Sequence, residues 1–517
     1  MPELLLGLDL GTTSVKALLL STGGDIVADV SVPYPLYSPQ VGWSEQEPED
    51  WWAGVCRVIP QALARANASP DHITGVAVSG QMHGAVVLDA HGAVVRPAIL
   101  WNDQRSGAQC ERITALLGTE RIIELVANLP QVGFTAPKIL WLREHEPEVY
   151  ERLRTILLPK DYINFRLTSA LATEYSDASG TLLFDVAHRR WSDEMLSALD
   201  IDPSFLPSVM GSTDLVGRVT PEAARATGLP AGTPVAAGGA DNACAALGSG
   251  VVDEGELLLS LGTSGTVLAA TSVPVLDTLG RVHTFCHAVP DRWYLMGVVL
   301  SAGGSLRWFR DTIGEVERRE AELTGREAFE LILESAEQVP PGSEGLIFLP
   351  YLTGERSPHA DPDARGVFFG LSPRHSRAHL ARSVAEGVAF ALADSVAIMR
   401  ELGIEVETVV ATGGGAASRL WRRIHAEIFR VSVLKGETAG PALGAAILAG
   451  LGTGVFPAVG PAVAAVVRAN DRIAPAAANV EIYRRYGEVF DALYPALKEE
   501  WHALRRVVAG TAPSGTG

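Results

Sequence analysis

Two aspartates stand beside turns of small or hydroxyl-bearing residues, where phosphoryl-transfer chemistry would need them. In Asp9-Leu-Gly-Thr-Thr-Ser14 a carboxylate at a strand end precedes a turn whose backbone N–H groups and hydroxyls can face a phosphate chain. In Ala237-Gly-Gly-Ala-Asp-Asn-Ala-Cys244 the surrounding residues are small enough for a substrate to approach Asp241. Asp9 could hold a metal ion, and Asp241 could accept the proton of an attacking hydroxyl. The plain alternatives are a tight glycine hairpin and a helix N-cap.

A second group of polar side chains could recognise a hydroxylated substrate. Gln81-Met-His-Gly84 follows a strand that ends at Ser79, and the carboxyl ends of strands often bind ligands in α/β proteins. Nearby, Trp101-Asn-Asp-Gln-Arg105 offers a ring face for the C–H surface of a sugar, together with hydrogen-bonding groups. The plain alternatives are a structural histidine, a core methionine and a loop held by an ion pair.

The turn that follows Asp9 recurs much later in the chain. Leu257-Leu-Leu-Ser-Leu-Gly-Thr-Ser-Gly-Thr-Val-Leu268 has the pattern of a strand, a Leu-Gly-Thr turn and a strand, as does the segment from Leu4 to Leu20. Two hydroxyl-bearing hairpins could hold the phosphates of a nucleotide from two sides. Lys16 could add a phosphate contact, or could be an exposed strand residue. The repeat therefore indicates a duplicated phosphate-binding device.

Three glycine-rich segments in the second half could border a nucleotide. Thr412-Gly-Gly-Gly-Ala-Ala-Ser-Arg-Leu-Trp421 lies between an apolar strand and a helix, so its backbone could lie flat against a ligand. Ser301-Ala-Gly-Gly304 precedes a helix, and Gly440-Pro-Ala-Leu-Gly-Ala-Ala446 begins one. Tight helix packing would explain the small residues of the last segment equally well. Neither a GxGxxG dinucleotide motif nor a GxxxxGK[ST] P-loop occurs.

Composition argues against several classes of function. The 517 residues carry a net charge of −18, whereas nucleic-acid surfaces need clustered basic residues. The four cysteines form no CxxC pair and no zinc spacing, so we expect them to be reduced. The chain has no signal-peptide pattern and no apolar run of about 18 residues that could span a bilayer. We therefore expect a cytoplasmic protein that acts on small molecules, without a nucleic-acid or membrane partner.

Length and pattern predict two α/β lobes, because a chain of this size exceeds one ordinary core and mixes strand-like with helix-like runs. We expect residues 1–246 to form an N-terminal lobe that binds sugar and phosphate. Residues 247–500 would form a C-terminal lobe that binds ATP. Residues 501–517 would contain the end of a terminal helix and a disordered tail.

These motifs resemble those of the FGGY carbohydrate kinases along the chain to about residue 500. Two family signatures are legible: Gly133-Phe-Thr-Ala-Pro-Lys-Ile-Leu-Trp-Leu-Arg-Glu-His145, and Gly366-Val-Phe-Phe-Gly-Leu371 running on to Glu386. The resemblance implies the two-lobed ribonuclease H-like fold shared by actin, heat-shock chaperones and sugar kinases, with the active site in the inter-lobe cleft. It also implies a sugar substrate, ATP with Mg²⁺, and a homodimer.

Within the family, Gln81–Gly84, Trp101–Asp103 and Leu158-Pro-Lys-Asp-Tyr162 are most similar to members that phosphorylate D-xylulose. Glycerol kinases carry an Arg-Glu pair at the positions of Met82 and His83. The resemblance implies that Asp241 is the general base on the 5-hydroxyl of the sugar. Together with the patterns above, it suggests sugar contacts by Met82, His83, Asn242, Trp101 and Asp103; a Mg²⁺ contact by Asp9; phosphate contacts by Thr12, Thr13, Lys16, Thr263 and Gly303; and adenosine contacts by Gly414, Gly415 and Ser418.

Two alternatives stay open at this point. An FGGY kinase for another pentulose or a polyol, such as ribulose or arabitol, would need only a few different pocket side chains. A sugar-independent ATPase of the same superfold would hydrolyse ATP regardless of sugar. A catalytically dead regulator is disfavoured because Asp9 and Asp241 are both present.

Overall fold

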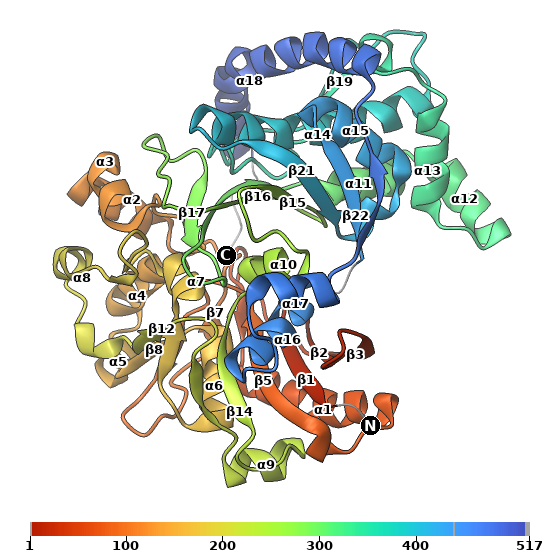
Figure 1. Cartoon of the computed structure of the whole chain (residues 1–517). Helices are drawn as coiled ribbons and strands as arrows, with labels where there is room; N and C mark the ends of the chain where they lie inside the picture. Colours follow the sequence, from red (N-terminus) through yellow and green to blue (C-terminus); the bar gives the residue numbers. More distant parts are fainter. Residues whose placement is uncertain (1–2, 438–439, 512–517) are drawn as a thin grey trace. The chain divides into compact units, whose positions relative to one another are not determined.

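The computed structural model describes residues 3–437 and 440–511 (Figure 1). Packing divides the chain into two compact α/β units. The first contains residues 1–253, 270–294 and 439–468, and the second contains residues 254–269, 295–438 and 469–517. Residues 439–468 thus pack with the first unit, although the sequence places them well inside the expected C-terminal lobe. Of the expected terminal segment 501–517, residues up to 511 continue the last helix, and the tail at 512–517 lies outside the described residues.

The first unit is built on a six-stranded sheet with the strand order β13-β14-β5-β1-β2-β3. Strand β1 is antiparallel to β2 and parallel to β5, and β5 is parallel to β14. The predicted hairpin from Leu4 to Leu20 is therefore confirmed. The strands are β1 (Leu4–Leu10), β2 (Ser14–Ser21), β3 (Ile26–Pro33), β5 (Ile73–Gly80), β13 (Leu215–Arg218) and β14 (Pro234–Ala240).

The second unit repeats this pattern. Its strands belong to a seven-stranded sheet with the order β17-β18-β16-β15-β21-β22-β23, in which β15 is antiparallel to β16 and parallel to β21. The strands are β15 (Gly255–Leu261), β16 (Gly265–Thr271), β18 (Trp293–Val299), β21 (Val406–Thr412), β22 (Ser432–Gly436) and β23 (Ala469–Ile473). Each sheet thus contains a hairpin whose first strand is parallel to a later strand, as the repeated sequence pattern predicts.

Helices surround both sheets, and short strands form small separate pairs. In the first unit the helices are α1 (Pro48–Ala66), α2 (Gly107–Leu117), α3 (Thr119–Val126), α4 (Thr135–His145), α5 (Pro147–Arg152), α6 (Pro159–Thr168), α7 (Tyr175–Ala178), α8 (Asp193–Leu199), α9 (Pro221–Thr227), α10 (Asp241–Gly248), α16 (Gly440–Gly452) and α17 (Val459–Val466). In the second they are α11 (Gly303–Thr312), α12 (Glu315–Thr324), α13 (Ala328–Glu337), α14 (Arg377–Glu401), α15 (Arg419–Phe429) and α18 (Ala477–Thr511). The short paired strands are β4 (Glu45–Gln46), β6 (Val86–Leu88), β7 (Ala98–Ile99), β8 (Thr155–Leu157), β9 (Ala172–Glu174), β10 (Phe184–Asp185), β11 (Arg190–Trp191), β12 (Ser208–Met210), β19 (Ile347–Leu349) and β20 (Val367–Phe369). Strand β17 (His283–Cys286) is instead the edge strand of the seven-stranded sheet.

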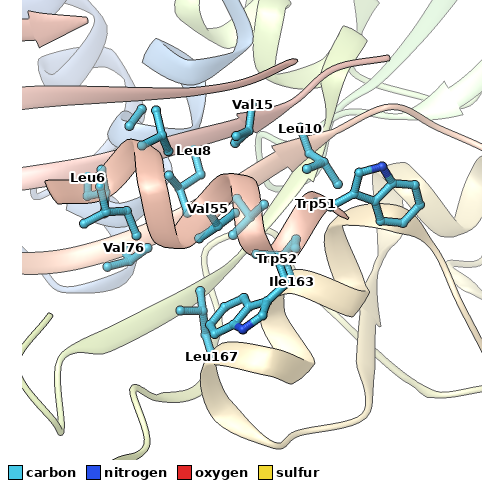
Figure 2. Packing of buried hydrophobic residues seen from close by; sticks show 14 of the residues in the cluster. Leu6, Leu8, Leu10, Val15, Trp51, Trp52, Val55, Val76, Ile163 and Leu167 are labelled. Atoms are coloured by element: carbon cyan, nitrogen blue, oxygen red, sulfur yellow. The ribbon is translucent and has the colours of Figure 1, made fainter. Parts of the chain in front are cut away.

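Strand β1 has two differently used faces, because successive side chains point to opposite sides of a sheet. Leu4, Leu6, Leu8 and Leu10 are all buried in the cluster that also contains residues of α1 and α6. Figure 2 shows Trp51, Trp52 and Val55 of α1 and Ile163 and Leu167 of α6 in this cluster. The alternation leaves Gly7 and Asp9 on the opposite face.

That opposite face is covered by α16 at very short range. A Cβ atom at Gly7 would lie 2.0 Å from the carbonyl oxygen of Ala442 and 2.6 Å from the amide nitrogen of Ala446. A Cβ atom at Gly444 would lie 2.0 Å from the carbonyl oxygen of Cys244 in α10. Close packing inside the first unit therefore accounts for the small residues of Gly440–Ala446. This agrees with tight helix packing, one of the two explanations that the sequence allowed for this segment.

Strand β14 ends in a bulge that directs the chain into α10. Its pairing with β5 shifts register between Ala236 and Gly239. Between them, Gly238 has φ +80°, and a Cβ atom there would lie 1.9 Å from the carbonyl oxygen of Val78. Only glycine fits this backbone position. The bulge therefore sets the direction in which Asp241, the first residue of α10, leaves the sheet.

We expect Gly7→Ala to destabilise the first unit by about 1–3 kcal/mol, because the added methyl group must displace the backbone of α16. Urea denaturation should show a lower unfolding midpoint. Gly107→Ala is the matched control, because a Cβ atom at Gly107 meets nothing within 4 Å. Equal midpoints for the two variants would contradict this account of the packing.

Candidate active site

Asp9 and Asp241 form an acidic pair in the first unit. Burial, together with the nearby charge of Asp9, raises the pKa of Asp241 to about 7, against hydrogen bonds from Asn242 that lower it. Burial also raises the pKa of Asp9 to about 6, opposed by Lys16 and Ser79. Asp9 Oδ1 is buried and has no hydrogen-bond partner among the described residues. Two desolvated carboxylates that influence each other fit a base and a cation ligand.

Asn242 orients the carboxylate of Asp241. Its backbone N–H and its Nδ2 both donate to Asp241 Oδ1, at 2.7 and 2.9 Å. Both of these hydrogen bonds go to Oδ1, so Oδ2 is the oxygen that could accept a proton. Asn242 Nδ2 also lies 3.7 Å from the sulfur of Met82. The structure therefore brings Asp241, Asn242 and Met82 together, as the predicted sugar site requires.

His83 joins this group in an unusual backbone conformation. Its φ is +69°, in the left-handed region that non-glycine residues seldom adopt. Its Nδ1 lies 2.7 Å from the carbonyl oxygen of Gly180, which can only accept, so Nδ1 carries the proton. A Cβ atom at Gly180 would lie 2.5 Å from the same nitrogen. The imidazole is thus fixed in tautomer and in place.

The first signature segment supports His83. Lys138 Nζ donates to the carbonyl oxygens of His83 and Gly133, at 2.9 and 2.6 Å, and the Thr135 hydroxyl donates to His83 at 3.1 Å. Burial lowers the pKa of Lys138 to about 7. The two donors on the carbonyl group of His83 stabilise the strained backbone there. This gives a physical reason for a hydroxyl residue at position 135 and a lysine at position 138.

The hairpin tip of the first unit is tied to the sugar segment by a buried network. Trp101 Nε1 donates to the Thr12 hydroxyl at 3.0 Å, and that hydroxyl donates to Gln81 Oε1 at 3.2 Å. Gln81 Nε2 donates to Gln46 Oε1 at 2.9 Å, and Gln46 Nε2 donates to the Thr12 carbonyl at 2.7 Å. The Thr12 side chain is therefore engaged within the protein, which leaves backbone N–H groups and the exposed Thr13 for the phosphate contact that the sequence predicts at this tip.

Asp103 and Lys16 have other partners in the structure. Asp103 is buried, and its carboxylate accepts hydrogen bonds from the backbone of Ser44 and from the backbone and side chain of Arg105. The loop held by an ion pair is thus present, and a sugar contact by Asp103 stays a prediction. Lys16 pairs with Asp29 at 3.1 Å on a partly exposed strand surface.

The second unit contains a pocket of about 600 Å³. Its walls include five predicted nucleotide contacts: Thr263, Gly303, Gly414, Gly415 and Ser418. The structure therefore brings these residues together in one pocket. Arg307, Phe329 and Trp421 also line it, and they provide a cation and apolar ring surface. A pocket of this size and mixed character suits a nucleotide.

Backbone contacts shape the end of this pocket that contains Thr263 and Gly303. The amide nitrogens of Gly303 and Gly304 donate to the carbonyl oxygens of Gly262 and Thr263, both at 2.9 Å. A Cβ atom at Gly303 would lie 2.4 Å from the Gly262 carbonyl oxygen. The tip of the second hairpin is thus held against the start of α11. Each tip is closed by its own backbone hydrogen bond. The N–H of Gly11 donates to the carbonyl oxygen of Ser14 at 3.1 Å, and the N–H of Gly262 donates to that of Ser264 at 3.0 Å.

Paired hairpins of this kind, on two sheets of similar order, define the chain as a protein of the actin-like ATPase fold. The models for the N-terminal and C-terminal domains of the FGGY family of carbohydrate kinases match residues 4–248 and 257–453. The chain belongs to the FGGY family of carbohydrate kinases.

Named relatives span nearly the whole chain. A xylulose kinase of Bacillus subtilis is 40% identical over 97% of this chain and 98% of its own length. One of Escherichia coli is 43% identical over 86% of this chain and 89% of its own length. The crystal structure of a xylulose kinase from Rhodospirillum rubrum has a TM-score of 0.89 at 32% identity, and covers 97% of this chain and 100% of that one. Within the described residues, no helix is both long and apolar enough to cross a membrane.

Several residues of the site were not predicted from the sequence. Gln46 and the run from Glu174 to Thr181 contact predicted site residues but were not singled out. The run Glu174-Tyr-Ser-Asp-Ala-Ser-Gly-Thr181 combines hydroxyls, carboxylates and a glycine after a strand, and that pattern could have marked it. Gln46 carries no such signal, because its partners lie 5 to 35 residues away in sequence.

The raised pKa of Asp241 makes a prediction about the pH dependence of sugar phosphorylation. Below about pH 7 Asp241 carries a proton and cannot accept another, so kcat/KM should fall as the pH drops through this value and level off above it. Asp9, with a pKa of about 6, should add a second acidic ionisation. ADP release can be followed between about pH 5 and 9 at constant ionic strength. A flat profile across this range would argue against an essential carboxylate in the site.

Proposed function

We propose that this protein transfers the γ-phosphoryl group of ATP to the 5-hydroxyl of D-xylulose, giving D-xylulose 5-phosphate and ADP. The proposal is supported by the family and by relatives named xylulose kinases along nearly the whole chain. The observation that carries the chemistry is a carboxylate with a pKa of about 7, that of Asp241, beside Met82 and Asn242.

Asp241 is the general base in this mechanism. Its Oδ2 accepts the proton of the 5-hydroxyl while the hydroxyl oxygen attacks the γ-phosphorus, and the bond from this phosphorus to the β–γ bridging oxygen breaks to release ADP. A base with a pKa near the working pH combines a useful ionised fraction with a strong enough affinity for the proton. Met82, His83 and Asn242 bind the sugar in the proposal, and the Trp101 ring faces its C–H surface.

In the second unit, Thr263 and Gly303 are the proposed phosphate contacts, and Gly414, Gly415 and Ser418 border the adenosine in the pocket. In the first unit, the backbone of the hairpin tip, Thr13 and Lys16 are proposed phosphate contacts.

Asp9 is the proposed residue that holds Mg²⁺. Its buried Oδ1 lacks a hydrogen-bond partner among the described residues, and hard cations prefer carboxylate oxygens. When bound, Mg²⁺ neutralises charge on the transferred phosphate. The family resemblance further suggests a cytoplasmic homodimer.

Substitution of the base gives a direct test. Asp241→Asn should lower kcat by about 10²- to 10⁴-fold, because the amide cannot accept the hydroxyl proton. Circular dichroism and the thermal midpoint should match those of the unchanged protein, since the two side chains have the same shape. Near-normal turnover by a folded Asp241→Asn variant would remove Asp241 from this role and make Asp9 the candidate.

Substrate profiling tests the choice of sugar. ADP release with MgATP should be measured with D-xylulose, D-ribulose, L-ribulose, L-xylulose, glycerol, D-arabitol and gluconate, with a no-sugar control. We expect D-xylulose to give the highest kcat/KM. A higher value for another sugar would retain the kinase chemistry and reassign the pocket around Met82 and His83. ATP turnover that no sugar accelerates would favour the sugar-independent ATPase.

A further inference from the structure

The backbone directly before Asp241 is held by a side chain from another part of the first unit. The N–H of Ala240, the last residue of β14, donates to the Ser176 hydroxyl at 2.9 Å. Neighbouring Gly239 packs tightly against Cys244, since a Cβ atom there would lie 3.0 Å from the Cys244 sulfur, whereas its 3.4 Å distance from the Ser176 oxygen would be an ordinary contact. The contact between Ser176 and Ala240 follows the bulge of β14 and precedes Asp241 by one residue.

The Ser176 hydroxyl is oriented by Glu174. It donates to Glu174 Oε1 at 2.8 Å. A hydroxyl has a single hydrogen, so this bond directs an oxygen lone pair of Ser176 towards the N–H of Ala240. The direction of the Ala240 contact is therefore determined by where the Glu174 carboxylate lies.

Glu174 is itself fixed by a full set of donors. It is completely buried, and it accepts the backbone N–H groups of Ser176 at 2.7 Å and Asp177 at 2.8 Å. The Ser212 hydroxyl donates to Glu174 Oε2 at 2.8 Å, and Lys160 Nζ lies 3.7 Å from Glu174 Oε1. A buried carboxylate with this many partners has little freedom to move. Glu174 thus provides a rigid reference point for Ser176.

The same segment also contacts His83, a predicted sugar contact. Four residues after Ser176, the carbonyl oxygen of Gly180 accepts the hydrogen bond of His83 Nδ1. A segment that touches both the residue before the proposed base and a proposed sugar contact can fix the distance between them. That distance matters because a displacement of about 1 Å can cost 10²-fold in rate.

We propose that Ser176 is a positioning residue for Asp241: oriented by Glu174, its hydroxyl holds the end of β14 so that the Asp241 carboxylate meets the attacking hydroxyl. This inference rests on the proposed role of Asp241 as the base. It assigns to Ser176 no contact with the sugar or with ATP, so its effect should appear in kcat rather than in KM.

Ser176→Ala tests the inference. We expect kcat for D-xylulose phosphorylation to fall about 10- to 100-fold while KM for sugar and for ATP changes less than about threefold. Ser176→Thr keeps the hydroxyl and should recover most of the lost kcat. A Ser176→Ala variant with kcat within threefold of the unchanged protein overturns the proposal, as does an equal loss in Ser176→Thr and Ser176→Ala.

Ser212→Ala is the matched control. It also removes a buried serine hydroxyl that donates to Glu174, at the same 2.8 Å, but it leaves the contact between Ser176 and Ala240 in place. We expect its kcat to stay within about threefold of the unchanged protein. If Ser212→Ala and Ser176→Ala lose kcat equally, the effect comes from general loosening around Glu174 and the proposal fails. Should Ser176→Ala not fold, Ser176→Cys replaces it as the test, because it nearly keeps the side-chain size with a poor hydrogen-bond acceptor. An unchanged kcat of Ser176→Cys would then overturn the proposal.

A double variant separates this inference from the proposed function. If Ser176 acts through Asp241, then Ser176→Ala should cost less than about threefold when Asp241→Asn is already present. A further 10-fold loss on that background would show that Ser176 acts by another route. An active Asp241→Asn variant would instead overturn the proposed base itself, whatever Ser176 does. Normal turnover by Ser176→Ala beside an inactive Asp241→Asn would overturn the positioning role alone.

Discussion

The first unit depends on one unfavourable arrangement: the carboxylates of Asp9 and Asp241 are buried near each other, with little water to solvate their charges. Burial raises the pKa of both Asp9 and Asp241, and the charge of Asp9 raises the pKa of Asp241 further. Such groups would relax apart, or draw in water, if their backbone could move. The bulge at Gly238, the Ser176 contact to Ala240 and the network around Thr12 all restrain the strand ends that carry them.

Small residues make this restraint possible. Gly7 in β1, Gly444 in α16 and Gly239 in β14 stand where backbone or side-chain atoms would otherwise collide. Without side chains there, α16 can lie directly on the sheet and α10 can pack against α16, β14 and β5. The leucines on the other face of β1 pack against α1 and α6, as Figure 2 shows, and contribute most of the apolar burial of the strand. One face of β1 thus packs in the apolar core, and the other carries Asp9.

Local sequence patterns predicted the parts of the site that are built from neighbouring residues. The runs before Gly11 and Gly262 end in turns with exposed threonines, and both were recognised as hairpins because apolar strands and glycine turns are short-range signals. The segment at Asp241 was recognised as a strand end that leads into a helix. For Asp103 the pattern allowed a sugar contact or a local ion pair, and the structure contains the ion pair with Arg105.

Long-range partners could not be predicted in this way. Trp101 and Thr12 are 89 residues apart, and Ser176 and Ala240 are 64 apart, so no periodicity connects them. Helix α16 was recognisable as a helix, but the side on which it packs depends on tertiary contacts. Its small residues fit a nucleotide pocket as well as they fit the back of β1, and only the contacts of Gly7 and Gly444 distinguish the two.

The late return of α16 has a consequence for the order in which the protein can fold. Gly7 leaves the ribosome long before Ala442, which covers it, because about 435 residues lie between them in the sequence. At about 5–20 residues per second, strand β1 waits roughly 20–90 s for this helix. During synthesis, the side of the sheet that bears Asp9 is therefore uncovered while the leucine side can already pack against α1. The packing over the Asp9 face of β1 is completed late, and a nascent chain cut short before α16 would carry Asp9 on a face of the sheet that α16 does not cover.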